Sequence, residues 1–130
     1  MYWDKKFDIG VDRIDFQHRI FLDLVVIFGE LTEADKIDKP KASRHLIEII
    51  KYADFHFTSE ENIMIENGYP EFESHRKLHK SILKKLEDSI MKFENDSSIA
   101  PDLYKFLFEW FATHTAIEDK KIGSFLENRS

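Results

Sequence analysis

The sequence contains no cysteine, which excludes disulfide bonds, zinc–thiolate sites, iron–sulfur clusters and thiol catalysis. It has only four glycines and three prolines in 130 residues, so few positions interrupt regular structure and long helices are favoured. No apolar run approaches the ~18 residues that a membrane span requires, and residues 1–7 lack the apolar stretch of a secretory signal. We therefore expect a cytoplasmic protein that contacts no membrane.

Charge and size narrow the possible classes further. Acidic side chains outnumber basic ones by 25 to 19, which gives a net charge of −6 and no basic surface for nucleic acid. The mass of 15.5 kDa and the hydrophobic fraction of 42% suit one domain with one core. A charged fraction of 34% and a mean hydropathy of −0.43 are typical of soluble proteins. We expect a single domain over residues 1–130, acting as a monomer.

The few breakers divide the chain into four helical segments. Proline is favoured in the first turn of a helix, and glycine just after the last turn. The three prolines therefore predict helix starts and Gly68 predicts a helix end, which gives helices over residues 12–31, 40–66, 70–94 and 101–126. Four such helices with short links form an all-α, up-down-up-down antiparallel four-helix bundle. A short N-terminal arm, residues 1–10, precedes them, and we expect Trp3 and Phe7 to pack it against the bundle.

Ionisable side chains interrupt the apolar faces of these helices. Apolar residues recur at steps of three and four, the spacing of a face that packs against neighbouring helices. Within those faces stand five histidines and one glutamate, namely His18, His56, Glu60, His75, His79 and His114. A buried polar group costs several kcal/mol unless something pairs with it. Any one of these histidines alone is explained as a satisfied core residue, but the six together predict a metal centre in the bundle core.

The spacing of these residues suits metal ligands. His56 and Glu60, like His75 and His79, are four residues apart, so each pair lies on one face of its helix. Imidazole and carboxylate donors suit iron, zinc, copper or manganese. Six or more donors exceed what one tetrahedral zinc ion accepts. The set therefore predicts two metal ions, with iron as the first candidate.

A seventh ligand is expected after His114, where Glu118 and Asp119 compete for the role. In an ideal helix Glu118 lies almost directly below His114, whereas Asp119 is displaced by about 140°. Spacing alone therefore favours Glu118. A local π-type turn would be needed to bring Asp119 in.

Several motifs together resemble those of a known family. They are Gly10-Val11-Asp12 with Ile14-Asp15-x-Gln17-His18, His56-Phe57-x-x-Glu60-Glu61 with Met64, Gly68-Tyr69-Pro70, His75-x-x-x-His79, and Trp110-x-x-x-His114 followed by Asp119. On these motifs the chain resembles the bacterial hemerythrins, single-domain oxygen carriers with a non-haem di-iron centre. The resemblance extends over nearly the whole chain.

The resemblance implies a complete ligand set. It nominates Asp119 rather than Glu118 as the seventh ligand. His75, His79 and His114 would bind one iron ion, and His18 and His56 the other. Glu60, Asp119 and an oxo or hydroxo group would bridge the two. This leaves the second iron with one free coordination position, where dioxygen would bind. Glu61 and Glu118 are then expected to be solvated or to lie behind the ligands, and His45 to lie at the surface.

Around the free position, the sequence offers a largely apolar environment. The candidates for a dry shell are Phe21, Phe55, Phe57, Phe72 and Phe111, extended by Leu107, with Ile117 facing the free position. An ordinary core is the better explanation of the phenylalanines. Thr115 is a departure, since related sequences usually carry an apolar residue after the histidine. Its hydroxyl could bond a backbone carbonyl or admit water.

The sequence thus predicts reversible dioxygen binding for storage, delivery or sensing, and not an enzyme. The lack of an attached signalling or membrane domain favours carriage over sensing. Two alternatives stay open: a di-iron enzyme that acts on peroxide or nitric oxide, and an iron-handling protein.

Overall fold

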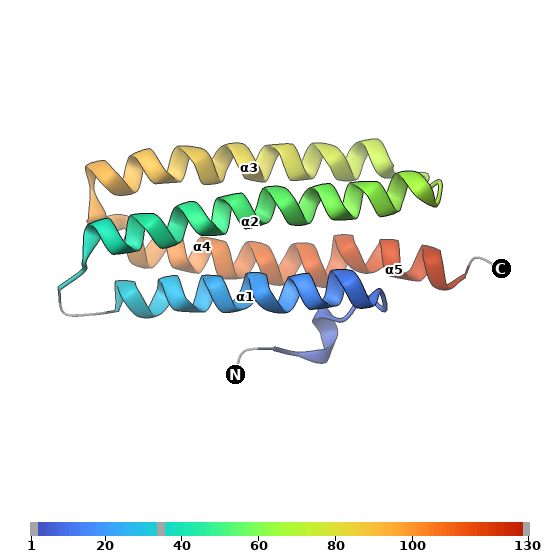
Figure 1. Ribbon diagram of the computed structural model, residues 1–130, viewed down its shortest axis with the longest axis horizontal. Coiled ribbons are helices and arrows are strands. Elements are labelled where there is room, and N and C mark those ends of the chain that lie inside the picture. The colour runs from blue at the N-terminus through green and yellow to red at the C-terminus, as the bar shows by residue number, and fades with distance from the viewer. Residues whose placement is uncertain (1–2, 34–35, 129–130) are drawn as a thin grey trace.

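The computed structural model describes residues 3–33 and 36–128, and within them the chain forms helices and no strand. Four long rods run side by side: α1 (Asp12–Thr32), α2 (Lys39–Glu66), α3 (Phe72–Asn95), and a fourth rod made of α4 (Ala100–Thr113), the π-helical segment η3 (His114–Asp119) and α5 (Lys120–Glu127). Successive rods run in opposite directions (Figure 1). The predicted all-α, up-down-up-down four-helix bundle is confirmed.

The helix ends follow from local capping. Asp38 caps α2, since its carboxylate accepts a hydrogen bond of 3.1 Å from the Lys41 N–H. Pro40 and Pro101 lie in the first turns of α2 and α4, as predicted. A short turn, η2 (Ser97–Ile99), leads from α3 into α4.

Helix α3 begins at Phe72, two residues later than the start predicted at Pro70. The reason is the way α2 ends. Gly68 adopts a φ of +66°, the Tyr69 N–H donates to the Met64 carbonyl at 2.9 Å, and the Gly68 N–H donates to the Ile65 carbonyl at 3.2 Å. These paired bonds close the helix in a Schellman motif. Pro70 belongs to the turn that follows, not to the next helix.

Apolar side chains from all four rods form the core. The fully buried ones include Val25, Phe28, Leu46, Ile49, Leu86, Phe93 and Leu107. Burying a side chain of this size stabilises the fold by about 1.5–3 kcal/mol. The core therefore holds the four backbones in fixed positions for the polar cluster described below. None of the described helices has the combination of length and apolarity that a membrane span requires.

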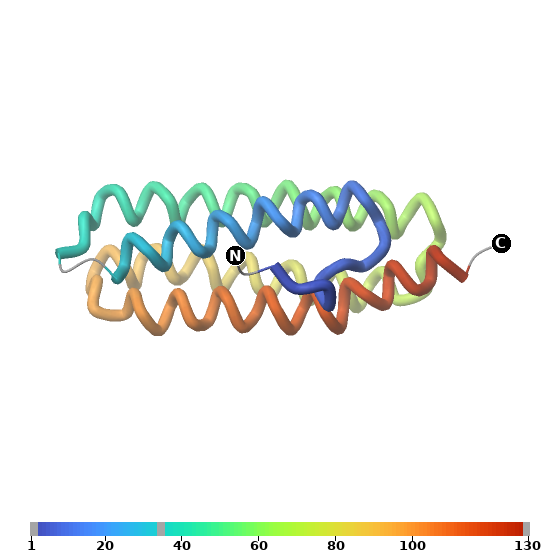
Figure 2. The backbone as a smooth tube through the Cα atoms, turned by 90° about the horizontal axis from the view of Figure 1, so that it is seen from below, coloured from blue at the N-terminus to red at the C-terminus, as the bar shows by residue number. Residues whose placement is uncertain are grey.

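The N-terminal arm folds back along the fourth rod (Figure 2). Its short helical turn η1 (Lys5–Phe7) buries Phe7. The Phe7 ring lies 5.4 Å from the Trp3 ring and 5.4 Å from the Phe111 ring, centroid to centroid. The expectation that Trp3 and Phe7 pack the arm against the bundle is confirmed.

Two contacts hold the end of the arm in place. The Asp15 carboxylate accepts hydrogen bonds from the Ile9 N–H at 2.8 Å and the Gly10 N–H at 3.2 Å. Gly123 on α5 lies so close to the arm that a Cβ atom there would stand 1.8 Å from the Ile9 carbonyl oxygen. The absence of a side chain at Gly123 is therefore what allows the arm to sit on α5.

Candidate metal centre

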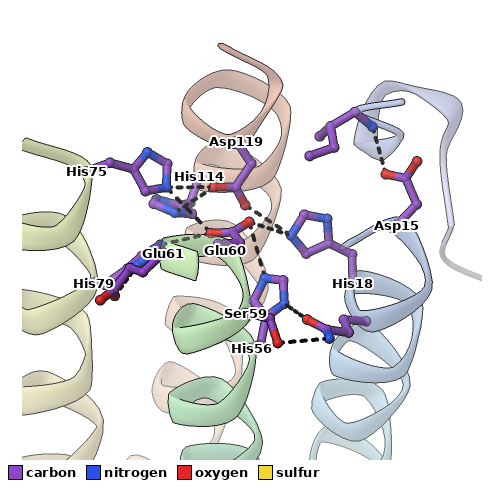
Figure 3. A network of polar contacts seen from close by, with 12 residues as sticks. Asp15, His18, His56, Ser59, Glu60, Glu61, His75, His79, His114 and Asp119 are labelled. Carbon is purple, nitrogen blue, oxygen red and sulfur yellow. Dashed lines mark hydrogen bonds and ion pairs between the residues drawn. The ribbon is translucent and has the colours of Figure 1, made fainter. Parts of the chain in front are cut away.

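The seven predicted ligands converge in the interior of the bundle (Figure 3). Each rod contributes: α1 carries His18, α2 carries His56 and Glu60, α3 carries His75 and His79, and η3 carries His114 and Asp119. All seven are buried, with 5% exposure or less. The spacing argument for the first six residues thus places them correctly, since side chains four residues apart on α2 and on α3 do point to one centre.

The Glu60 carboxylate stands between two groups of histidines. Its Oε1 atom lies 2.9 Å from the His79 Nε2 and 3.5 Å from the His75 Nε2. Its Oε2 atom lies 3.4 Å from the Nε2 atoms of both His18 and His56. One oxygen therefore faces α3 and the other faces α1, which is the arrangement of a carboxylate that can bridge two ions.

Asp119 repeats this arrangement from the opposite side. Its Oδ1 atom lies 3.0 Å from the Nε2 atoms of His75 and His114. Its Oδ2 atom lies 3.0 Å from the His18 Nε2. Neighbouring ligands at right angles, each about 2.1 Å from an octahedral ion, stand about 3.0 Å apart. The spacing around Asp119 is that of donors sharing an ion.

The donors therefore fall into two overlapping groups. One consists of Glu60, His75, His79, His114 and Asp119, and the other of His18, His56, Glu60 and Asp119. In each group the possible ligand atoms lie within 4.8 Å of one another. The two carboxylates belong to both. Each group is able to hold a metal ion.

The π-helical segment η3 explains how Asp119 reaches the cluster. A π-turn accommodates one residue more than an α-turn, so the residue five positions after His114 returns to the same face. Glu118 instead points outward, its side chain 32% exposed and its Oε2 atom 3.5 Å from the Lys121 Nζ. The ideal-helix preference for Glu118 is thus wrong in its premise, because this stretch is not an α-helix.

Most of the polar atoms that face the centre of the cluster have no hydrogen-bond partner among the described residues. These buried atoms are both carboxylate oxygens of Glu60 and of Asp119, and the Nε2 atoms of His18, His75, His79 and His114. The nitrogens and oxygens lie close together but are not aligned as hydrogen bonds. Leaving so many buried polar atoms unsatisfied is costly. Metal ions would satisfy all of them at once, so the donor set fits a metal centre.

The histidines and carboxylates of the cluster shift one another's pKa values. Burial alone would raise the pKa of Glu60 and of Asp119, but the surrounding histidines outweigh burial and hold both pKa values below their usual range. Burial would lower the pKa of His18 and of His75, yet the Asp119 and Glu60 carboxylates outweigh it and raise each pKa to about 9. Burial is dominant at His56 and lowers its pKa. Without metal, the site thus carries paired charges.

Two ligand histidines are oriented from behind. The His56 Nδ1 lies 2.7 Å from the Gln17 Oε1, and the Gln17 amide nitrogen donates to the Ser59 hydroxyl at 3.1 Å. The His79 Nδ1 lies 3.0 Å from the Glu61 Oε2. Such a bond at Nδ1 fixes the proton there and leaves Nε2 bare for a metal. Glu61 thus lies behind a ligand, one of the two places expected for it.

Sequence reasoning missed the roles of Gln17 and Ser59. Gln17 stands next to His18 in a quoted motif, but its partner His56 is 39 positions away. No local spacing pairs residues that far apart. The one available signal was the burial of an amide and a hydroxyl on otherwise apolar faces. His45, by contrast, lies outside the cluster and is partly exposed, with its Nδ1 3.8 Å from the Glu48 Oε1.

Aromatic rings pack directly on the ligands. The Phe57 ring stacks on the His79 ring at 4.0 Å, and the Trp110 ring stacks on the His114 ring at 4.9 Å. A cavity of about 10 Å³ lies beside them, close to the minimum that holds one water molecule. Its lining consists of His18, Phe21, His56, Phe57, Trp110, Phe111, His114, Thr115 and Asp119.

The predicted apolar shell is partly right. Phe21, Phe57 and Phe111 line the cavity, as expected. Phe55 and Ile117 do not, because their side chains turn outward and are 52% and 54% exposed. Two further expectations also need correction, since neither residue lines the cavity: Leu107 is buried in the main core, and Phe72 packs against a separate cluster around Met64, Tyr69 and Ile122.

Comparison with known proteins agrees with this geometry. Residues 9–126 match the family model described as the hemerythrin HHE cation-binding domain. A bacteriohemerythrin from Clostridium acetobutylicum is 29% identical over 92% of this chain and 95% of its own length. A myohemerythrin from Theromyzon tessulatum is 25% identical over 92% of this chain and 88% of its own length.

Solved structures extend the comparison to the fold. A crystal structure of wild-type hemerythrin superposes with a TM-score of 0.87 at 26% identity, covering 95% of each chain. The family model matches most of the sequence, and the fold is shared over nearly its full length. The chain therefore belongs to the hemerythrin family.

Proposed function

We propose that this protein binds dioxygen reversibly at a non-haem di-iron centre. The observation that carries the proposal is the pair of overlapping donor groups, which share Glu60 and Asp119 and bury polar atoms that find no other partner. When bound, two ferrous ions supply the two electrons that dioxygen takes up on binding and returns on release. The chain's part is to hold the ions, orient their ligands and keep water away.

The proposed ligand assignment follows the two groups. His75, His79 and His114 would hold one iron and His18 and His56 the other, and Glu60 and Asp119 belong to both groups. With an oxo or hydroxo group shared between the ions, the first iron would have six donors and the second five.

The free position is thus assigned to the second iron, and the cavity supports this. The cavity is lined by both histidines assigned to that iron, His18 and His56, but by only one of the three histidines assigned to the first iron, His114. A space of about 10 Å³ admits only a small ligand, and its other lining is mainly aromatic. Such a site suits a diatomic ligand and excludes larger substrates, but peroxide and nitric oxide are as small as dioxygen. We propose a carrier or store, not an enzyme, and the test below separates it from an enzyme that acts on those two molecules. A single domain over residues 1–130, acting as a cytoplasmic monomer, is part of the same proposal.

An absorption spectrum of the aerobic protein, with iron quantified, tests the proposal. We expect about two irons per chain, charge-transfer bands in the near ultraviolet and an oxygenated band that reverses on deoxygenation. Catalytic consumption of peroxide or nitric oxide would favour an enzyme. Loss of iron on dialysis would favour an iron-handling protein.

A matched pair of variants tests the ligands themselves. His79→Ala should abolish stable loading of two irons, because it removes a fully buried donor. His45→Ala removes a histidine outside the cluster and should leave iron content unchanged. Full iron content in His79→Ala would refute the assignment of His79 as a ligand.

A further inference from the structure

The cavity beside His18 and His56 contains one side chain that the proposed function does not use. Apart from the proposed ligands, its lining consists of the four aromatic residues Phe21, Phe57, Trp110 and Phe111, and of Thr115. Among the described residues that line this space, Thr115 is the one with an aliphatic hydroxyl; the others are aromatic residues and proposed metal ligands.

The Thr115 hydroxyl makes no hydrogen bond with the residues that the structure describes. The residue as a whole is 2% exposed. A threonine in a helix commonly bonds the carbonyl three or four residues earlier, as Thr32 and Thr58 do here at 2.8 and 2.9 Å. A hydroxyl without a partner in the protein can donate a hydrogen bond to a molecule beside it. In this cavity, the available partner is whatever molecule occupies it.

The position of Thr115 suits such a contact. It follows His114 directly in η3, and it lines the same cavity as His18 and His56. A ligand in a space this small cannot avoid the side chains around it. Of these, the threonine side chain offers a hydroxyl that can rotate to donate a hydrogen bond.

We infer that Thr115 is a specificity-determining residue: its hydroxyl donates a hydrogen bond to the ligand held in the cavity. The site therefore retains ligands whose outer atom accepts a hydrogen bond, and releases them more slowly than an all-apolar cavity would. This inference rests on the proposed function, because it requires a ligand at the free position of the second iron.

The test compares Thr115→Val, which removes the hydroxyl and keeps the shape, with Thr115→Ser, which keeps the hydroxyl. The iron-loaded protein is first studied with azide, an anion whose end atom accepts a hydrogen bond and which carries no proton of its own. We expect Thr115→Val to release azide about tenfold faster, the effect of one hydrogen bond to a charged group. The infrared stretching band of bound azide should shift in D2O for the unaltered protein and for Thr115→Ser, but not for Thr115→Val.

Controls separate this role from a structural one. Thr113→Val makes the same change at an exposed site two residues away and should alter neither the release rate nor the band. Equal release rates and bands in Thr115→Val and the unaltered protein would overturn the inference. It would also be overturned if Thr115→Ser behaved like Thr115→Val, since lost packing would then explain the effect, or if the unaltered protein bound no azide.

Measuring dioxygen binding in the same proteins distinguishes a failure of this inference from a failure of the proposed function. If the azide results hold but no reversible oxygenated band forms, the proposed function fails while the role of Thr115 stands. If dioxygen binds reversibly and both Thr115 variants release azide like the unaltered protein, only the role of Thr115 fails.

Discussion

Loading metal at neutral pH should displace about two protons from His18 and His75. The Asp119 and Glu60 carboxylates raise the pKa of each imidazole to about 9, so both are protonated at pH 7 in the metal-free protein. A metal ion needs the bare Nε2 atom, so binding must release these protons. The pKa of His56 is lowered, and this histidine contributes none. Formation of a hydroxide bridge from water would add one, so the expected total is about two to three.

The same protons make affinity depend on pH. Each displaced proton changes the apparent binding constant about tenfold per pH unit, so the two histidines together contribute about a hundredfold between pH 7 and pH 8. Cobalt(II) is a suitable redox-stable probe. Calorimetric titrations in buffers of different ionisation enthalpy give the number of protons directly. His45→Ala, which lies outside the cluster, should release the same number. Fewer than one proton, or an affinity independent of pH, would refute the argument.

In the metal-free protein, the same two groups set the stability at high pH. Because the pKa values of His18 and His75 are higher in the folded state, their contribution is fully present below about pH 6.5 and is lost as pH rises through about 9. Each contributes up to about 3 kcal/mol. The pKa values of Glu60 and Asp119 are lower in the folded state, so these two carboxylates stabilise the fold at neutral pH. Their contribution to stability is lost as the pH falls and they become protonated. Urea unfolding of the metal-free protein should therefore show falling stability from pH 7 to pH 10. A flat profile would contradict the ion pairs.

Three further outcomes can be checked with simple variants or with metal removal. Asp119→Asn should lower the metal bound per chain after gel filtration, whereas Glu118→Gln should not, because only the first residue lies in the cluster; the reverse result would restore the ideal-helix assignment. Gly123→Ala should destabilise the protein by about 1–3 kcal/mol in urea unfolding, because its Cβ would collide with the Ile9 backbone. Gly29→Ala would meet a tyrosine ring, which is a side chain and can shift more readily than the backbone, so it should cost less; equal losses would argue against the packing of the arm on α5. Removing metal should lower the melting temperature, since binding to the folded state alone stabilises it; an unchanged transition would contradict a core site.

Much of this architecture could be predicted from residue spacing alone. Pro40 and Pro101 mark helix starts because a proline in the first turn loses no hydrogen bond. Six cluster residues could be found because ionisable groups on an apolar face demand a common partner. Both arguments start from the pattern of residues within a single helix, which is why short-range spacing suffices.

The remaining features depend on contacts that no short-range pattern encodes. The turn after α2 absorbs Pro70, since a six-residue hydrogen-bond arrangement takes precedence over the helix-start preference of proline. On spacing alone, the choice of Asp119 over Glu118 required knowing that η3 is π-helical. The spacing shows that a π-turn is needed to bring Asp119 to the cluster, but it does not show that the chain forms one.

The wide turn at His114–Asp119 also determines which residues of α5 point toward the rest of the bundle. Accommodating one additional residue rotates everything after it by about 100° relative to an uninterrupted α-helix. Ile122 is buried and Gly123 meets the Ile9 backbone only in that rotated phase. If the same six residues formed an ordinary α-helix instead, the aspartate would turn away from the cluster and the N-terminal segment would lose its place on α5. Loss of one residue from this segment, by contrast, would convert the wide turn into an α-turn and leave the aspartate four positions after the histidine, on the same face.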